Sequence, residues 1–218
     1  MNYNPYRQQV YDTTLRLVDI DLIRLSSGNI SVKCPDGNIA ITPSGITYDV
    51  LKPEDIVIMD SDANLIEGDY KPSSEKHLHT EIYKVRPEVN AIVHTHSCYA
   101  IAFSAVGMEI PVINLEVLVV GGPVPVAEFT TPGTPEVGVR AAKFFADRLE
   151  LKALLMQNHG MVAVGKTLDE AYQNAYKTET GAEIYHLALQ TGREVKPLSE
   201  AQIDDIFNRY QKPKESQA

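Results

Sequence analysis

The apolar residues of this chain recur with two different spacings, which predict a mixture of helices and short strands. Helical spacing is found over 6–23 and 135–149, and it is clearest over 168–191. Short apolar runs between glycine, proline and small polar residues instead predict strands. Such strands are expected at 30–33, 38–42, 56–59, 91–96, 115–120, 124–128, 151–157 and 160–164.

Three further helices complete the predicted order of elements. One covers about 72–85 and begins with a serine at its N-cap, and two shorter ones cover 97–106 and 199–210. Neither an internal repeat nor a linker interrupts the pattern, so we expect one domain over 1–210 and a polar tail over 211–218. The irregular alternation of strands and helices predicts an α/β fold in which helices cover both faces of a mixed sheet.

Two histidines at the end of an apolar run are the strongest chemical signal. His94 and His96 follow Ala91-Ile92-Val93, and alternate side chains of a strand point to the same face, so the two rings would lie side by side. A third histidine, His159, follows the apolar run 153–156. A His-x-His pair with one distant histidine is the ligand set of a catalytic zinc site that keeps a position open. Each histidine alone could be an ordinary buried residue, but three at strand ends favour a metal site.

Three turns of small residues predict a cradle for an anion. They are Ser27-Gly28-Asn29, Ser44-Gly45 and Ser73-Ser74, and each offers hydroxyl groups and open backbone N–H groups. The third lies at a predicted helix N-terminus, where the helix dipole favours negative charge. Such turns are common singly, so only the set is informative. Glu75 follows the third turn, either as a first-turn carboxylate or as a metal ligand or general base, and its position alone does not decide between these roles.

Composition excludes several partners. The 218 residues carry a net charge of −9, which argues against a nucleic-acid or anionic-membrane surface but leaves an anionic small substrate open. The two cysteines, Cys34 and Cys98, predict a reducing compartment. Residues 1–9 lack a hydrophobic signal core, and no apolar run approaches the roughly 20 residues that span a bilayer. We therefore expect a cytoplasmic protein.

Five short motifs follow one another along the chain. They are Ser-Gly-Asn-Ile-Ser (27–31), Thr-Pro-Ser-Gly (42–45), Pro-Ser-Ser-Glu (72–75), His-Thr-His (94–96) and Asn-His-Gly (158–160). Taken together, they resemble the class II aldolase family, which includes L-fuculose-1-phosphate aldolase, L-rhamnulose-1-phosphate aldolase and L-ribulose-5-phosphate 4-epimerase. The motifs occur in the family's order within about 15–189, and their spacing is most similar to the fuculose-phosphate aldolase branch.

The resemblance implies a role for each of these motifs. His94, His96 and His159 would bind one Zn²⁺ per subunit, or Mn²⁺ or Co²⁺ in its place. Glu75 would be a fourth ligand at rest, and would then leave the metal and act as the base. The resemblance also implies a three-layer α/β/α fold with a largely antiparallel mixed sheet, and a homotetramer with active sites at subunit interfaces. The phosphate of a sugar phosphate would be held by Gly28, Asn29, Ser44, Gly45, Ser73 and Ser74.

The implied reaction is the cleavage of a ketose 1-phosphate to dihydroxyacetone phosphate and an aldehyde. One alternative is a ribulose-5-phosphate 4-epimerase, although the segment 114–120 lacks the aspartate that epimerases supply there. Another is an aldolase for a different deoxy- or methylthio-pentulose 1-phosphate. A non-catalytic homologue, similar to the adducin head domains, is disfavoured because all three histidines are present.

The proton donor is the least determined part of the site. In the fuculose branch a tyrosine of the neighbouring subunit serves as the proton donor, and the matching position here is Leu115. Glu116 and Tyr210 are therefore the candidate donors, and the apolar stretch 110–126 is a candidate interface. Of the remaining histidines, His79 lies four residues after Glu75 and could orient it, whereas we expect a structural role for His186.

Overall fold

The computed structural model describes the chain from residue 1 to 211, and its side chains as far as residue 209. Apart from α4, the helices form where helices are predicted from the sequence, and a 3₁₀ turn covers Pro53–Asp55. The helices are α1 (Asn4–Asp19), α2 (Lys76–Val85), α3 (Cys98–Ala105), α4 (Leu115–Val119), α5 (Pro135–Asp147), α6 (Leu168–Gln190) and α7 (Glu200–Gln211). The strands are β1 (Asn29–Lys33), β2 (Ile39–Ile41), β3 (Val57–Met59), β4 (Leu65–Glu67), β5 (Ala91–Thr95), β6 (Val126–Ala127), β7 (Ala153–Met156) and β8 (Gly160–Gly165).

The eight described strands form one sheet in the order β4-β3-β2-β1-β5-β8-β7-β6. Only β6 and β7 pair in parallel, and the other described pairs are antiparallel. The prediction of a mixed, largely antiparallel sheet is therefore confirmed. Strands β1, β5 and β8 lie at its centre, and they carry or adjoin most of the predicted site residues.

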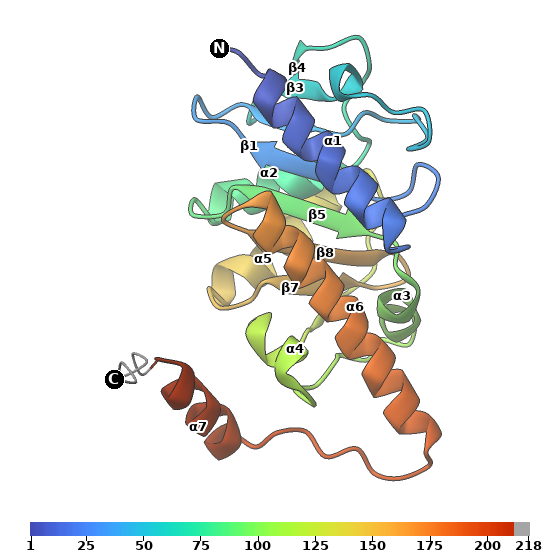
Figure 1. Ribbon diagram of the computed structural model, residues 1–218, viewed down its shortest axis with the longest axis vertical. Helices are drawn as coiled ribbons and strands as arrows, with labels where there is room; N and C mark the ends of the chain where they lie inside the picture. The colour runs from blue at the N-terminus through green and yellow to red at the C-terminus, as the bar shows by residue number, and fades with distance from the viewer. Residues whose placement is uncertain (212–218) are drawn as a thin grey trace, which may run out of the picture.

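Helices cover both faces of the sheet, as predicted (Figure 1). On β5, Ala91 and Val93 join the core formed with α1, α3, α4 and α6, whereas Ile92 between them joins the core formed with α2 and α5. This alternation follows from the two-residue period of a strand. All three side chains are fully buried, and burial of Ile92 or of Val93 contributes about 1.5–3 kcal/mol. His94 lies two residues after Ile92, so its side chain points to the same face of the sheet, toward α2.

Residues 115–119 form a helix, so the predicted strand over 115–120 is wrong. Asn114 caps this helix, because its side-chain oxygen accepts a hydrogen bond from the Val117 backbone N–H at 3.0 Å. Val117 packs so closely on α6 that a Cβ added to Gly181 would lie 2.5 Å from it. Packing and the cap thus override the strand preference of a valine-rich run.

Smaller differences concern the ends of elements. Helix α2 begins later than predicted, with Glu75 rather than a serine at its N-cap. Strand β4 was not predicted, because all three of its residues are exposed and show no apolar pattern. Helix α7 includes Gln211, and the rest of the predicted tail, 212–218, lies outside the described residues. None of the helices within 1–211 combines the length and apolar character needed to cross a membrane.

Candidate active site

The sheet brings the two histidines of the His-Thr-His motif to one face. His94 lies in β5, in register with Asn29 of β1 on one side and Val162 of β8 on the other. His96 follows the last residue of β5, so the predicted strand ends one residue earlier than its second histidine. The rings still converge as predicted, with centroids 4.9 Å apart.

His159 reaches the same point from the tight turn between β7 and β8. Asn158 adopts the left-handed conformation in this turn (φ 55°), which asparagine tolerates better than most residues. Gly160 follows, and a Cβ there would lie 2.4 Å from the Thr95 carbonyl oxygen. Only glycine therefore lets the turn approach β5 closely enough to place His159 beside His94, with ring centroids 4.8 Å apart.

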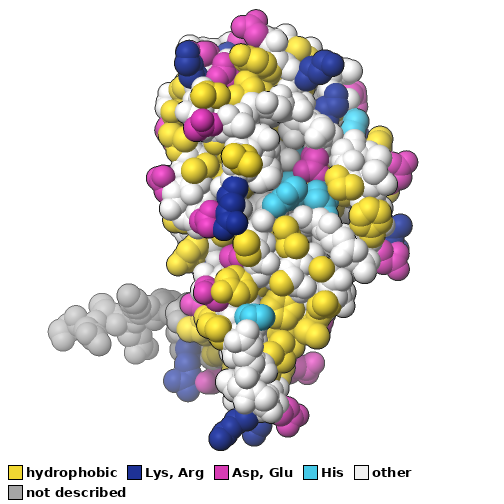
Figure 2. Space-filling view, turned by 90° about the vertical axis from the view of Figure 1, so that its right-hand side faces the viewer, with side chains coloured by type: hydrophobic (Ala, Val, Ile, Leu, Met, Phe, Trp, Pro, Cys, Tyr) yellow, Lys and Arg dark blue, Asp and Glu magenta, His cyan; other side chains and the backbone are white. Residues whose placement is uncertain are grey.

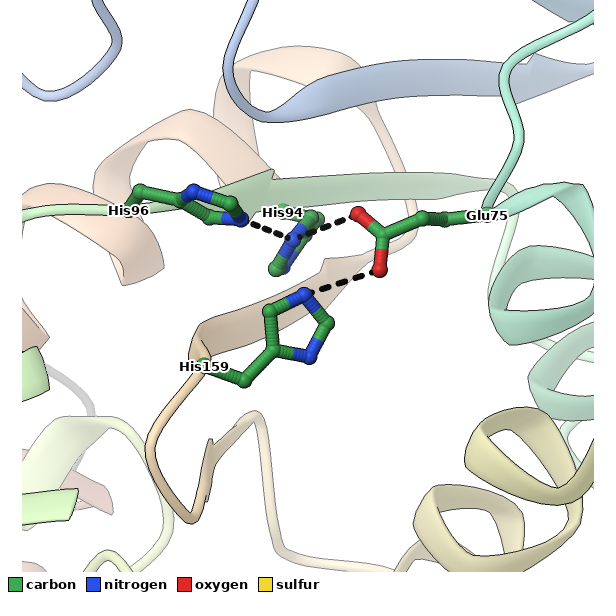
Figure 3. Close-up of side chains that lie close together, drawn as sticks. All are labelled: Glu75, His94, His96 and His159. Atoms are coloured by element: carbon green, nitrogen blue, oxygen red, sulfur yellow. Dashed lines mark hydrogen bonds and ion pairs between the residues drawn. The ribbon is translucent and has the colours of Figure 1, made fainter. Parts of the chain in front are cut away.

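Glu75 completes the group from the N-terminus of α2 (Figure 3). Its Oε2 atom lies 2.9 Å from His94 Nε2, and its Oε1 atom lies 2.8 Å from His159 Nε2. One ligand atom from each of Glu75, His94, His96 and His159 lies within 4.8 Å of all the others. The four residues that the resemblance assigns to the metal are thus brought together.

The hydrogen bonding of these side chains fits a cation at their centre. His94 Nδ1 lies 2.8 Å from the Met161 carbonyl oxygen, which can only accept, so this nitrogen carries the proton. A cation at the centre would leave the ring neutral, with the lone pair of Nε2 directed at it; this nitrogen lies 2.9 Å from Glu75 Oε2 and 3.0 Å from His96 Nε2. Within the described residues, His159 Nδ1 is buried without a hydrogen-bond partner, and Glu75 Oε1 and His159 Nε2 have only each other, at 2.8 Å. Converging lone pairs of this kind suit a divalent ion held by nitrogen and oxygen ligands.

The charges of the group are strongly coupled. Burial alone would raise the pKa of Glu75, but the adjacent His94 and His159 outweigh burial and lower it below its usual range. Burial would likewise lower the pKa of His94, yet Glu75 raises it. Burial lowers the pKa of His96 to about 4, and the neighbouring histidines act in the same direction. His96 is therefore neutral at neutral pH, with its lone pair available.

The three small-residue turns meet beside this group, in a hollow of about 370 Å³. Figure 2 shows histidine side chains at this face next to an acidic one, with hydrophobic side chains gathered below them. Gly28 holds the first turn against β5, because its φ is +84° and a Cβ there would lie 2.7 Å from the His94 carbonyl oxygen. All six predicted phosphate residues line the hollow, together with Glu75, His96 and His159: they are Gly28, Asn29, Ser44, Gly45, Ser73 and Ser74.

Part of the hollow was missed by the sequence analysis. Pro132 and Gly133, in the loop between β6 and α5, also line it, beside the third turn: a Cβ on Gly133 would lie 3.5 Å from the Ser74 carbonyl oxygen. The run Thr-Thr-Pro-Gly-Thr over 130–134 is a turn signal that could have drawn attention to this loop.

Of the two candidate proton donors, only Glu116 can be placed relative to the hollow. Glu116 lies in the first turn of α4 and is not among the residues that line it. The backbone of Tyr210 lies in α7, and its side chain is outside the described residues. The His186 ring lies near that of Tyr99, tilted by 52° with 5.6 Å between ring centroids, and His186 is not part of the four-residue group.

Comparison with known proteins identifies the family. The family described as "Class II Aldolase and Adducin N-terminal domain" matches residues 8–186. The chain is 34% identical to the 5-deoxy-D-ribulose 1-phosphate aldolase of Bacillus thuringiensis serovar kurstaki, over 94% of this chain and 95% of that protein. It is also 34% identical to the L-fuculose phosphate aldolase of Escherichia coli strain K12, over 96% of both chains.

A solved structure gives the same result. The structure of an L-fuculose 1-phosphate aldolase superposes with a TM-score of 0.90 at 34% identity, covering 97% of this chain and 99% of the other. The three-layer arrangement of helices around one mixed sheet is thus that of a known aldolase. The chain therefore belongs to the class II aldolase family and is an enzyme of the aldehyde-lyase type, with a group of one glutamate and three histidines able to hold a metal ion.

Proposed function

We propose that this enzyme cleaves a ketose 1-phosphate to dihydroxyacetone phosphate and an aldehyde. The observation that carries the proposal is that a single hollow is lined both by the small-residue turns and by the metal-binding group. A 1-phosphate is one carbon away from the C2 carbonyl of a ketose. A site for this substrate must therefore place the phosphate cradle directly beside the metal-binding group, as this hollow does.

The phosphate is held by dipoles rather than by cationic side chains. Among the described residues, no lysine or arginine lines the hollow. Backbone N–H groups at Gly28 and Gly45, both with positive φ, are open to an anion because glycine has no side chain to cover them. The hydroxyls of Ser44, Ser73 and Ser74 add further donors, and such clusters of N–H and O–H dipoles form anion sites without a formal charge.

His94, His96, His159 and Glu75 would hold the metal, which we propose is Zn²⁺, with Mn²⁺ or Co²⁺ able to replace it. A divalent ion there supplies Lewis-acid stabilisation of the negative charge that develops on the ketose oxygens when the C3–C4 bond breaks. The bond electrons pass toward C3, and the C4 hydroxyl loses its proton as the aldehyde forms. In this direction Glu75 must first take up a proton from solvent, which it then gives to C3, while the C4 hydroxyl proton passes to a separate group. In the condensation direction the Glu75 carboxylate removes the proton from dihydroxyacetone phosphate.

The group that exchanges the C4 hydroxyl proton comes, we propose, from a neighbouring subunit. Glu116 and Tyr210 are the candidates, since Glu75 is the only acidic residue among the described ones that line the hollow. We further propose a substrate whose tail beyond C4 is small and apolar, like a deoxyketose. The hydrophobic side chains gathered beside the hollow support this choice (Figure 2).

A product assay tests the proposed reaction. The purified enzyme is incubated with L-fuculose 1-phosphate, L-rhamnulose 1-phosphate, 5-deoxyribulose 1-phosphate and 5-methylthioribulose 1-phosphate, and dihydroxyacetone phosphate is detected with glycerol-phosphate dehydrogenase. We expect at least one substrate to release it, and chelator to stop the release. Failure with every member, together with conversion of L-ribulose 5-phosphate to its xylulose epimer, would instead establish an epimerase.

We propose that the working enzyme is a homotetramer with its sites at subunit interfaces. Most apolar side chains of the predicted interface stretch 110–126 are buried within the subunit, so they cannot contact a partner. Leu115 and Val119 on α4 remain 45% and 41% exposed, and Val106 and Met108 are 70% and 41% exposed after α3. These four residues are the better candidates for the interface.

Replacing Leu115 with aspartate is expected to convert the oligomer to smaller species. A buried interface of this kind exceeds about 1,000 Å², and an uncompensated carboxylate inside it is costly. The helix itself should tolerate the change, because acidic residues are favoured in a first turn. Leu65→Asp is the matched control, since Leu65 is 46% exposed on the edge strand β4, at the opposite end of the sheet from α4 (Figure 1). Sedimentation velocity reads the result, and a wild-type monomer with full activity would refute the proposal.

A further inference from the structure

A chain of buried polar side chains leads from Glu75 into the space between α2 and β1. Asn29 Nδ2 donates a hydrogen bond to Glu75 Oε2 at 3.0 Å, and Asn29 Oδ1 lies 2.5 Å from His79 Nε2. Ser31 Oγ lies 2.6 Å from His79 Nδ1 and 2.8 Å from the Tyr83 hydroxyl oxygen. His79 and Ser31 are completely buried, and Asn29 is 3% exposed. The chain is thus a continuous polar path inside an otherwise apolar layer.

The path exists because the spacings of a helix and a strand nearly match. Glu75, His79 and Tyr83 are four residues apart on α2, so each lies about 6 Å beyond the previous one. Asn29 and Ser31 lie on one face of β1, about 6.6 Å apart. The hydrogen bonds therefore alternate between helix and strand. They link Glu75, His79 and Tyr83 of the helix through Asn29 and Ser31 of the strand. Changing any spacing by one residue would turn a member away from the path.

Every donor in this path points toward Glu75. A carboxylate can only accept, so Asn29 must present its NH₂ group to Glu75 and its carbonyl oxygen to His79. His79 Nε2 must then carry the proton. Burial lowers the pKa of His79 to about 3, with the nearby His94 acting in the same direction, so the ring is neutral and Nδ1 is bare. Ser31 therefore donates to Nδ1, and its oxygen accepts from Tyr83.

We infer that Asn29 and His79 are positioning residues for Glu75. They hold its carboxylate by the Oε2 atom, so that Oε1 is the oxygen that exchanges a proton with the substrate. The inference rests on the role of Glu75 as base in the proposed function. Asn29 donates to Oε2 and not to Oε1, which lies 2.8 Å from His159 Nε2. Asn29 also interrupts any proton path toward Tyr83, because an amide N–H does not give up its proton at neutral pH. The path orients the carboxylate and stabilises its negative charge, but it does not supply protons.

Kinetics of His79 variants test the positioning role. His79→Leu removes the donor to Asn29, and loss of a residue that supports a metal-site carboxylate typically lowers activity 10–100-fold. We expect that loss in kcat, with KM changed less than about threefold. His79→Gln keeps an N–H near the Nε2 position and should recover most of the rate. Tyr83→Phe, at the far end of the path, should cost less than His79→Leu.

A double-mutant cycle separates positioning from a general structural effect. In a Glu75→Gln background, His79→Leu should cause no further loss of kcat, because its effect acts through the carboxylate. Urea unfolding confirms that each variant is folded before it is assayed. An equal loss in both backgrounds would show that His79 merely supports the fold, and would overturn the inference.

Nitrogen-15 NMR of the histidine rings tests the hydrogen-bond path without any substrate. In the zinc-loaded protein, His79 should be a neutral Nε2–H tautomer whose ring proton exchanges slowly with water, and its signals should vanish in His79→Gln. An Nδ1–H tautomer would reverse the path and overturn the inference. If the wild-type protein shows the expected tautomer yet cleaves no ketose phosphate, the proposed substrate is wrong while the hydrogen-bond path stands.

Discussion

Replacing Glu75 with glutamine is expected to lower kcat about 10²–10⁴-fold, the usual contribution of a general base, while most of the metal stays bound. Glutamine keeps the shape of the side chain and an oxygen that can face His94, so the fold and the three histidine ligands are retained. It cannot take a proton from carbon. Turnover and metal content, measured on the same preparation, distinguish the loss of a base from the loss of a ligand.

Hydrogen exchange on dihydroxyacetone phosphate alone tests whether proton removal from carbon is the step that Glu75→Gln lacks. In D₂O, and without any aldehyde, the wild-type enzyme should exchange one hydrogen of the C3 hydroxymethyl group of dihydroxyacetone phosphate, because Glu75 removes it reversibly. Glu75→Gln should lose this exchange along with cleavage. Glu81→Gln is the matched control, since Glu81 is on the same helix but pairs with Lys84 instead of a site residue. Exchange at the wild-type rate in Glu75→Gln would refute the assignment of the base.

The metal-binding group could be predicted from the sequence because its chemistry is carried by few residue types. The two-residue spacing of His94 and His96 predicts that they share a face, and that geometry survives although β5 ends at Thr95. The small-residue turns also lie where the motifs place them. The distant ligand His159 could be chosen because it follows the apolar run 153–156 and stands beside asparagine and glycine, as expected at the end of a strand.

The parts that escaped prediction depend on contacts between distant segments. Leu115–Val119 resembles a strand locally, and only the Asn114 cap and the packing of Val117 on α6 make it a helix. Asn29 was assigned to phosphate from its turn, yet its side chain also joins Glu75 to His79, residues 46 and 50 positions away. The local sequence pattern does not indicate which residue of a strand will contact a given face of a helix.

Removal of the metal is expected to abolish activity and leave the fold in place. Elemental analysis should find about one divalent ion per chain, and dialysis against a strong chelator should reduce turnover to background. Zn²⁺ should restore it, and Mn²⁺ or Co²⁺ should do so at least in part. The apo protein should keep its circular dichroism spectrum because the sheet and its two cores do not depend on the ion. Its unfolding temperature should fall, since an ion present at 1,000 times its Kd stabilises the folded state by about 4 kcal/mol.

Two histidine variants make this test specific to the proposed site. His159→Ala removes one ligand and should lower both metal content and turnover, whereas His186→Ala changes a histidine outside the group and should leave both unchanged. Added Zn²⁺ should raise the unfolding temperature of His186→Ala as it does that of the wild type, and should raise that of His159→Ala much less. Full activity after exhaustive chelation, or equal metal content in the two variants, would contradict a catalytic metal held by His94, His96 and His159.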